Sequence, residues 1–210
     1  EHWEIKRFRY LFNLSKGLTI TKENLQDTGV PCVNYGEIHS KYNFELDMNK
    51  HLLKSVDSRY IDTHESSLIK SGDFVFADTS EDFEGCGNFT HLVSDSNIFA
   101  GYHTIIGRLV ANNSRYLSYF LDSDVWRNQV RKMVKGVKVF SISQKILKDT
   151  TLFLPSRNEQ DKAANYLDNQ MQLMKELEKE THDSIKLLKE HRTALISAAV
   201  TGKIDVREVA

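Results

Sequence analysis

The sequence is poor in the residues that build disulfide-linked or zinc-binding domains. It has two cysteines among 210 residues, Cys32 and Cys86, too few for a disulfide framework or for a zinc site without histidine ligands. The eight histidines show neither an H-E-x-x-H motif nor a zinc-ligand spacing. We therefore expect no bound metal, and the low cysteine content favours a reduced, cytoplasmic setting.

Long apolar stretches are absent as well. No run approaches the roughly 20 apolar residues that a membrane-spanning helix needs, and no signal peptide is visible. A hydrophobic content of 40%, with 11 Phe and 8 Tyr, is nevertheless enough to build a core. The length suits one globular domain with an appendage, and the sequence predicts no membrane partner.

Catalytic motifs are missing too. The sequence contains no G-x-G-x-x-G, no P-loop and no G-x-S-x-G. His103, which we expect inside a strand, has no Ser or Cys that it could activate. The acidic loop 78–84 lacks the spacing of an EF-hand. We interpret the chain as a non-catalytic binding protein without a cofactor. One alternative stays open, a metal-dependent nuclease or hydrolase that uses loop 78–84.

Proline and glycine are absent from the interior of the segment between Pro155 and Gly202. Ser156 and Glu159 form an S-x-x-E capping box at its start. Gly202 is at the position where a helix commonly ends with a glycine in the left-handed backbone conformation. Such a helix would be about 65 Å long. Because it is too long for the core of so small a chain, we expect it to project from the domain and to pair with a partner.

The apolar pattern of this helix repeats every seven residues. One series runs through Leu167, Met174, Thr181, Leu188 and Leu195, and a second contains Leu177 with several polar residues. The pattern favours a helix that dimerises or docks partners over one that folds back on its own domain. A coiled-coil adaptor without DNA contact is a further alternative. The expected interface residues are Leu167, Met174, Leu177, Leu188 and Leu195.

The net charge of −1 hides a strong segregation of charge. Seven basic residues and no acidic one lie between Arg127 and Lys148, whereas six acidic residues and no Lys or Arg lie between Ser71 and Gly107. A basic segment of this kind is either a solvated helix face or a phosphate-binding patch. If all seven cations met phosphates, the logarithmic salt dependence of DNA binding would approach a slope of about −6. The candidates for phosphate contact are Arg127, Arg131, Lys132, Lys135 and Lys138, and those for base contact are Lys41, Tyr42, Thr79 and Ser80.

Short strands and helices alternate before the long helix. Apolar runs predict strands at Phe74–Ala77, Phe89–Leu92, Asn97–Val110 and Thr151–Leu154. Helices are expected from Ser114, after Asp122 and from Ser143. The sequence therefore predicts an α+β fold, a strand-rich domain over residues 1–154 followed by a long coiled-coil-forming helix with a short tail over residues 155–210.

Several motifs spread along the chain resemble one known family. They are Glu1-His2-Trp3-Glu4 with Arg7-Phe8, Gly72-Asp73, Leu154-Pro155 with Glu159-Gln160, and the tail Leu195-Ile196-Ser197-Ala198-Ala199-Val200-Thr201-Gly202-Lys203-Ile204-Asp205. Together they resemble the specificity subunit of type I restriction-modification systems. The resemblance covers one target-recognition domain and one conserved helical region, and it is firmest in the helix.

The resemblance implies a function for each part. Specificity subunits have no catalytic activity of their own. The globular domain would recognise one half of a bipartite double-stranded DNA site. The long helix would act as a spacer and dock methyltransferase subunits, which allow a restriction subunit to join. Family members normally carry two recognition domains and two helices, so we expect either a half-subunit that pairs with a second copy or one half of a longer chain.

Overall fold

The computed structural model describes residues 2–136 and 138–204, so Glu1, Val137 and residues 205–210, including Asp205 of the tail motif, lie outside the described residues. The chain forms two compact units, Glu1–Ala164 and Asn165–Ala210. The division falls inside helix α6 (Arg157–Val200), ten residues beyond the boundary expected from the sequence. Gln160 and Ala164, on the first turns of α6, are buried. Through these residues the start of the helix packs with the first unit.

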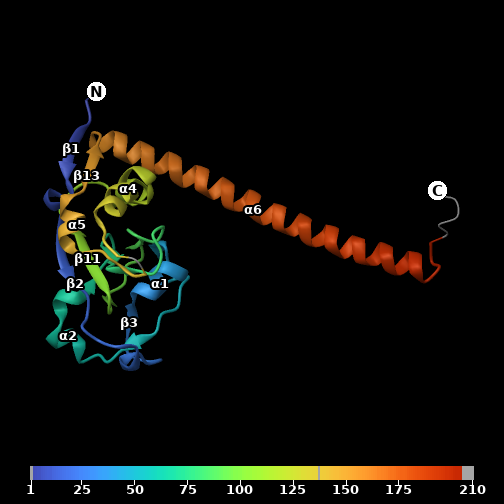
Figure 1. Ribbon diagram of the computed structural model, residues 1–210, viewed down its shortest axis with the longest axis horizontal. Coiled ribbons are helices and arrows are strands. Elements are labelled where there is room, and N and C mark those ends of the chain that lie inside the picture. Colours follow the sequence, from blue (N-terminus) through green and yellow to red (C-terminus); the bar gives the residue numbers. More distant parts are fainter. Residues whose placement is uncertain (1, 137, 205–210) are drawn as a thin grey trace. The chain divides into compact units, whose positions relative to one another are not determined.

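A five-stranded sheet forms the centre of the first unit (Figure 1). All neighbouring strands are antiparallel except β4 and β9, which are parallel. The two strands predicted at Phe74–Ala77 and Phe89–Leu92 are confirmed at the same bounds. In order across the sheet, the strands are β2 (Phe12–Lys16), β11 (Thr104–Leu109), β7 (Phe74–Ala77), β9 (Phe89–Leu92) and β4 (Phe44–Leu46).

Smaller sheets complete the domain. The four-stranded sheet contains, in order, β5 (Ser55–Val56), β3 (Val30–Val33), β10 (Ile98–Ala100) and β6 (Leu68–Ile69). Two ribbons pair β1 (Glu4–Arg7) with β13 (Thr151–Leu154), and β8 (Thr79–Ser80) with β12 (Phe140–Ser141). The single strand expected over Asn97–Val110 is two strands, β10 and β11. His103 therefore lies in the turn between them and not inside a strand.

The helices of the first unit are short. They are α1 (Tyr35–Ser40), α2 (Tyr60–Thr63), α3 (Ser114–Asp122), α4 (Asp124–Met133) and α5 (Gln144–Asp149), with 3-10 turns at Phe8–Tyr10, Lys22–Asn24 and Glu65–Ser67. The N-cap of α3 is Asn113, one residue before the expected Ser114, because the Asn113 side chain accepts a hydrogen bond from the Tyr116 amide. The break between α3 and α4 falls at Ser123, as predicted.

Strand β7 lies at the centre of the core because both of its faces are covered. Successive side chains of a strand point to opposite faces. Phe74 and Phe76 belong to the cluster that contains Trp126, whereas Val75 and Ala77 belong to the cluster that contains Ile38 of α1. Figure 1 accordingly shows α1 on the opposite side of the domain from the β1–β13 ribbon. An uninterrupted apolar run is the expected sequence for a strand covered on both faces.

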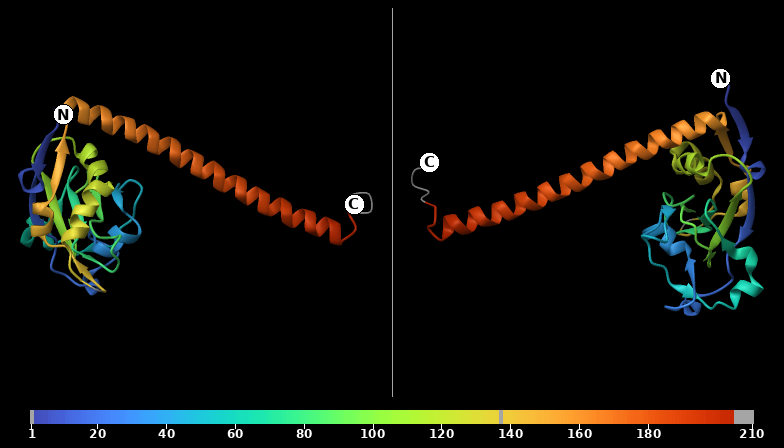
Figure 2. Two further views of the ribbon diagram at one scale, coloured as in Figure 1. Left: turned by 45° about the horizontal axis from the view of Figure 1, so that its top comes forward. Right: turned by 180° about the vertical axis from the view of Figure 1, so that it is seen from behind.

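Helix α6 has both of its predicted ends. The Ser156 amide donates to the Glu159 carboxylate at 2.9 Å, and the Glu159 amide donates to the Ser156 hydroxyl at 3.4 Å, which completes the capping box. Gly202 has a φ of 70°, and the Lys203 amide bonds the Ala198 carbonyl at 2.9 Å. Figure 2 shows the helix continuous in two further views.

None of the described helices, α6 included, is long and apolar enough to cross a membrane. The α+β class with a long C-terminal helix is therefore confirmed.

Candidate nucleic-acid interface

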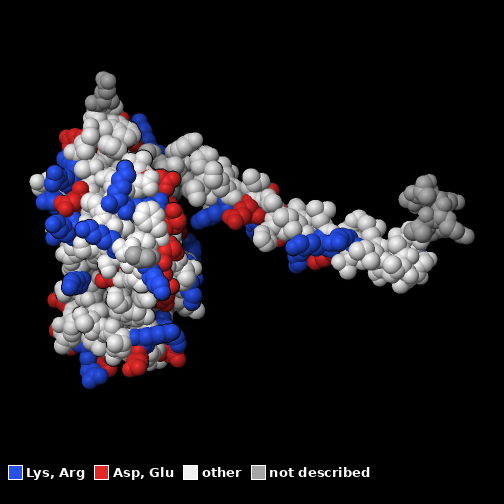
Figure 3. Space-filling view, in the orientation of Figure 1, with Lys and Arg blue, Asp and Glu red and all other residues white. Residues whose placement is uncertain are grey.

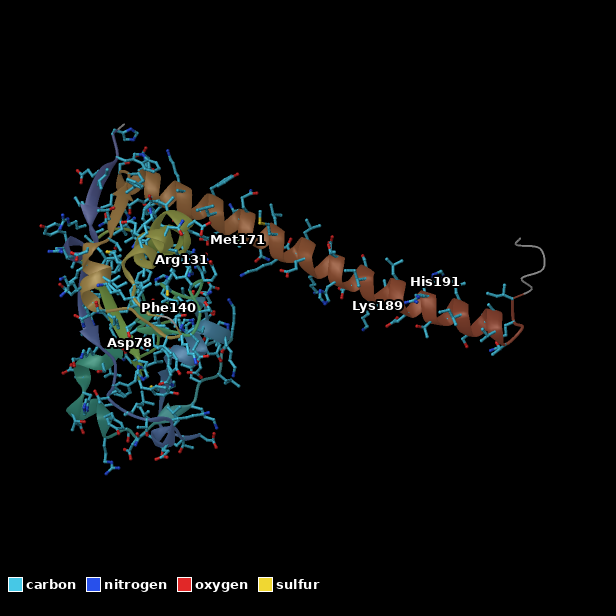
Figure 4. The ribbon with its side chains drawn as sticks, in the orientation of Figure 1. Asp78, Arg131, Phe140, Met171, Lys189 and His191 are labelled. Atoms are coloured by element: carbon cyan, nitrogen blue, oxygen red, sulfur yellow. The ribbon has the colours of Figure 1, made fainter. Side chains whose placement is uncertain are left out.

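The β8–β12 ribbon brings the acidic loop and the basic segment together. Thr79 pairs with Ser141 and Ser80 pairs with Phe140, while the Phe83 and Phe140 rings meet edge to face at 5.7 Å. In Figure 4, Asp78, Phe140 and Arg131 all lie on the first unit. Two segments of opposite charge, about sixty residues apart in the sequence, are thus neighbours. Their proximity decides which of the charged groups are available to a ligand.

Two of the five phosphate-contact candidates are engaged inside the domain. Arg127 is only 7% exposed, and its guanidinium donates to Asn88 at 2.6 Å and to the Asp122 carboxylate at 2.7 Å. Arg131 forms an ion pair with Glu84 at 2.7 Å. These contacts join α4 to the chain segments beside it. They account for both arginines without DNA, and they neutralise part of the acidic loop.

The lysines of the same segment differ from the two arginines in their exposure and in their contacts. Lys132, Lys135, Lys138 and Lys145 are exposed. Within residues 2–136 and 138–204, none of them has a carboxylate close enough for an ion pair. Acidic and basic atoms are mixed on the face of the domain shown in Figure 3. The four lysines therefore stay candidates for phosphate contact, for which the lysine ammonium is suited as a strongly hydrated point charge on a flexible stem.

The base-contact candidates also divide into two groups. Tyr42 is 8% exposed and donates its hydroxyl to the Leu52 carbonyl at 2.6 Å, and Ser80 is 1% exposed and donates to the Asp82 carbonyl at 2.8 Å. These two hydroxyls therefore stabilise loops. Lys41 is exposed and Thr79 is half-buried beside a hollow. The structure leaves Lys41 and Thr79 as the accessible members of this set.

The hollow beside Thr79 has a volume of about 580 Å³. It is lined by polar side chains from four separate segments, namely Lys16, Asp78 with Thr79, His103, and a stretch that includes Ser141, Gln144 and Lys145. His103 contributes a side chain that is 58% exposed and lies 3.1 Å from Asp78. His103 was not predicted at this hollow because we expected the residue inside a strand. The preceding Gly101 was the signal for a turn.

Three of the four carboxylates of loop 78–84 have separate partners. The Asp78 carboxylate bonds Thr79 and His103, the Asp82 carboxylate accepts from the Gly85 amide, and Glu84 pairs with Arg131. Among the residues that the structure describes, no group of three or more His, Cys, Asp or Glu side chains is placed to hold a metal ion. The metal-dependent alternative therefore has no ligand set within this part of the chain.

Most of the expected helix-interface residues are exposed. Met174, Leu177, Leu188 and Leu195 are between 46% and 68% exposed, and Leu167 is half-buried. Large apolar side chains this exposed are unusual when they recur along one helix. The second unit thus presents an apolar stripe over several turns.

A family model, the type I restriction modification DNA specificity domain, matches residues 1–187. The chain belongs to this family. The match extends from the first strand, over the ribbon and hollow, and far into α6. The family is described as a DNA specificity domain and not as a catalytic one.

Solved structures show the same fold. The specificity domain aligns with a chain from a structure on complex assembly and conformational transition of the type I R-M system, at 16% identity and a TM-score of 0.71, covering 94% of this chain and 45% of that one. The HsdS subunit from Thermoanaerobacter tengcongensis aligns at 16% identity with a TM-score of 0.63, and the alignment covers 96% of this chain and 46% of that one. The type I S subunit from M. genitalium aligns at 18% identity with a TM-score of 0.51, and the alignment covers 80% of this chain and 38% of that one.

The specificity domain spans less than half the length of each of these chains. At such low identity the alignments establish the fold alone. No match was found among curated proteins.

Proposed function

We propose that this chain contacts one half of a bipartite double-stranded DNA site through its first unit, and that α6 sets the distance to the other half. The proposal rests above all on one observation: in a member of the DNA specificity family, one chain segment carries four exposed lysines that have no carboxylate partner among the described residues, Lys132, Lys135, Lys138 and Lys145, and Lys145 lines the polar hollow. Lysines supply the sequence-independent phosphate contacts that fix register, and hydrogen-bonding groups of the hollow supply base contacts.

The paired arginines belong to the scaffold of this proposed interface. Arg127 and Arg131 hold α4 against the segments that carry Asn88 and Glu84. Arg131 neutralises the Glu84 carboxylate of the acidic loop, which lowers the repulsion that a polyanion would meet there. This ion pair supports the proposal that DNA approaches beside the loop.

Selection from a randomised duplex pool tests the proposal. The full chain, incubated with the pool at moderate salt, is expected to enrich duplexes that share a short motif. If two copies act together, the motif is expected as an inverted repeat with a fixed gap, because a two-fold axis relates the half-sites. Recovery of an unenriched pool after repeated rounds, with the chain folded, would remove the DNA-recognition proposal. A coiled-coil adaptor predicts self-association with this negative result.

The second unit fits a role as spacer and dock. A rigid helix maintains a half-site separation, and its apolar stripe is available to a second copy or to the second half of a longer specificity subunit. Polar positions within the seven-residue repeat, Gln170, Thr181, Ser184 and His191, suit a surface shared among several helices. Methyltransferase subunits would bind this helical assembly, and the restriction subunit would join through them.

Leu188→Glu is expected to weaken self-association of the full chain by at least about 10-fold, because burying a leucine contributes about 1.5–3 kcal/mol and a carboxylate would be buried in its place. Sedimentation equilibrium measures the change. Lys186→Glu, which places the same charge on the polar side of α6, is the matched control and leaves association nearly unchanged. Equal dimerisation by Leu188→Glu and the unaltered chain, with methyltransferase recruitment retained, contradicts the docking role of the stripe.

A further inference from the structure

Asp78 ties together three segments that are distant in the sequence. Its backbone amide donates to the His103 carbonyl at 3.0 Å, and its carbonyl accepts from the Ile142 amide at 2.8 Å. Its carboxylate accepts from the Thr79 hydroxyl at 2.8 Å and lies 3.1 Å from Nδ1 of His103. One residue at the end of β7 therefore fixes the positions of the β8 strand, the turn before β11 and the segment after β12.

The buried side chain of Asn34 packs against the turn that carries His103 and bonds its backbone. A Cβ on Gly101 would lie 1.9 Å from the Asn34 side-chain oxygen, and that same oxygen accepts from the Tyr102 amide at 3.2 Å. Asn34 is 2% exposed. The backbone can approach Asn34 this closely only because position 101 lacks a side chain. The turn is thus rigid at its base.

His103 itself adopts a backbone conformation that is unusual for a residue with a side chain, with a φ of 54°. Strain of this kind persists where surrounding contacts impose it, and it is concentrated at functional positions. The imidazole is flanked by the rings of Tyr35 at 5.2 Å and Tyr102 at 6.1 Å. Its side chain is nevertheless 58% exposed. The imidazole is therefore accessible to a ligand.

We propose that His103 is a base-contacting residue of this specificity domain, positioned by Asp78, and that it accepts a hydrogen bond from the exocyclic amino group of an adenine or a cytosine. This inference rests on the proposed DNA recognition and deepens it. An ionised carboxylate can only accept, so the proton of the neutral ring lies on Nδ1, towards Asp78. The outward nitrogen, Nε2, then has a free lone pair. In the major groove the donors are the amino groups of adenine and cytosine.

The surroundings of His103 suit a groove contact. Lys16 and Lys145 line the same hollow and are exposed, so they are available to bind phosphates near the contacted base. Thr79, which shares the Asp78 carboxylate with His103, has a hydroxyl oxygen that can accept a second bond from the same base pair. A base contact flanked by phosphate contacts is the general arrangement of protein–DNA interfaces.

The test compares motifs selected by the full chain and by two variants. His103→Phe keeps an aromatic ring against Tyr35 and Tyr102 but removes both nitrogens. His64→Phe is the matched control, since His64 is also exposed and also contacts a tyrosine ring, Tyr60 at 5.5 Å. We expect His103→Phe to lose preference at one position of the motif by about 5- to 20-fold. We expect its binding to an unrelated duplex and its melting temperature to stay unchanged, and His64→Phe to select the original motif.

Base analogues identify the contacted group. At the position where preference is lost, adenine is replaced by purine, or cytosine by its 4-deamino analogue, so that only the amino group is deleted. The unaltered chain should lose the same 5- to 20-fold, and His103→Phe should lose nothing more, as two changes to one contact are not additive. Equal losses for both proteins overturn the assignment.

The outcomes separate the two proposals. If the unaltered chain selects no motif, DNA recognition itself fails. If it selects a motif and His103→Phe selects the same one with the same preferences, DNA recognition stands and the role of His103 is rejected. Asp78→Ala provides a second check on the positioning residue. It should relax preference at the His103 position alone, and a uniform loss at all positions would show a merely structural effect.

Discussion

Joint charge reversal of Lys135 and Lys138 to glutamate is expected to weaken duplex binding by about 30- to 1000-fold at low salt. Both lysines are exposed and without a carboxylate partner in the described parts of the chain. Each reversal removes a phosphate contact and adds a repulsive charge, which together correspond to about 2–4 kcal/mol. Fluorescence anisotropy with a labelled duplex measures the change.

The salt dependence gives an independent measure of the same contacts. The ion pairs of the two arginines and the partial burial of Lys148 reduce the slope expected from the whole basic segment, and four exposed lysines remain. Lys132, Lys135, Lys138 and Lys145 should together contribute about −3.6 to the logarithmic slope, and about −1.8 should remain of this contribution in the double variant.

Lys22→Glu with Lys70→Glu is the matched control, because it makes the same change of charge at exposed lysines outside the basic segment. If this control weakens binding as strongly as Lys135→Glu with Lys138→Glu, the effect comes from net charge. A slope that does not change in the Lys135/Lys138 variant would remove these lysines from the interface.

The second large effect concerns the stability of the domain below neutral pH. Burial lowers the pKa of His91 from 6.5 to about 4, with a smaller contribution from the positive charge of Arg115. Within the part of the chain that the structure describes, neither ring nitrogen of His91 has a hydrogen-bond partner, and the ring stacks on Phe74 at 4.6 Å. A charged imidazole there would be neither hydrated nor paired.

The direction of the effect follows from proton binding. Between pH 6.5 and pH 4 the unfolded chain binds a proton at His91 and the folded chain does not, so stability falls as the pH falls. The contribution of His91, fully present above pH 6.5 and lost towards pH 4, amounts to about 3 kcal/mol. Urea unfolding followed by tryptophan fluorescence measures it, since Trp126 is buried in the same unit.

His91→Phe should remove this part of the pH dependence, because phenylalanine keeps the stacking and cannot be protonated. His64→Phe, at an exposed histidine, should leave the pH dependence as it is. A native-like fall in stability between pH 6.5 and pH 4 in His91→Phe would assign the effect to other groups.

Much of the architecture depends on local interactions and was therefore predictable. The capping box of Ser156 and Glu159, the terminator Gly202 and the absence of proline between them specify α6, since each acts within one helical turn. Strands β7, β9 and β13 were predictable because short apolar runs bounded by turn residues have few alternatives. Family membership was evident from motifs at the junction and in the helix.

The candidate site was only partly predictable, because its properties come from contacts between distant segments. The sequence identified a basic segment and an acidic loop but not their contact, which depends on the pairing of β8 with β12. Contacts of Arg127 with Asn88 and of Arg131 with Glu84 likewise engage the two arginines, whereas Lys132, Lys135, Lys138 and Lys145 have no carboxylate partner among the described residues. Likewise, Asn34 and Asp78 hold His103 in its turn from positions 69 and 25 residues earlier in the chain.

The sequence by itself thus determined the α+β class, the long helix with its two ends and the segregation of charge, because periodicity, capping and composition are local properties. Tertiary structure alone decided which charges remain available, where the compact unit ends along α6, and which polar side chains surround one hollow. These depend on packing and strand register, where a shift of one residue would move every side chain to the other face of its strand.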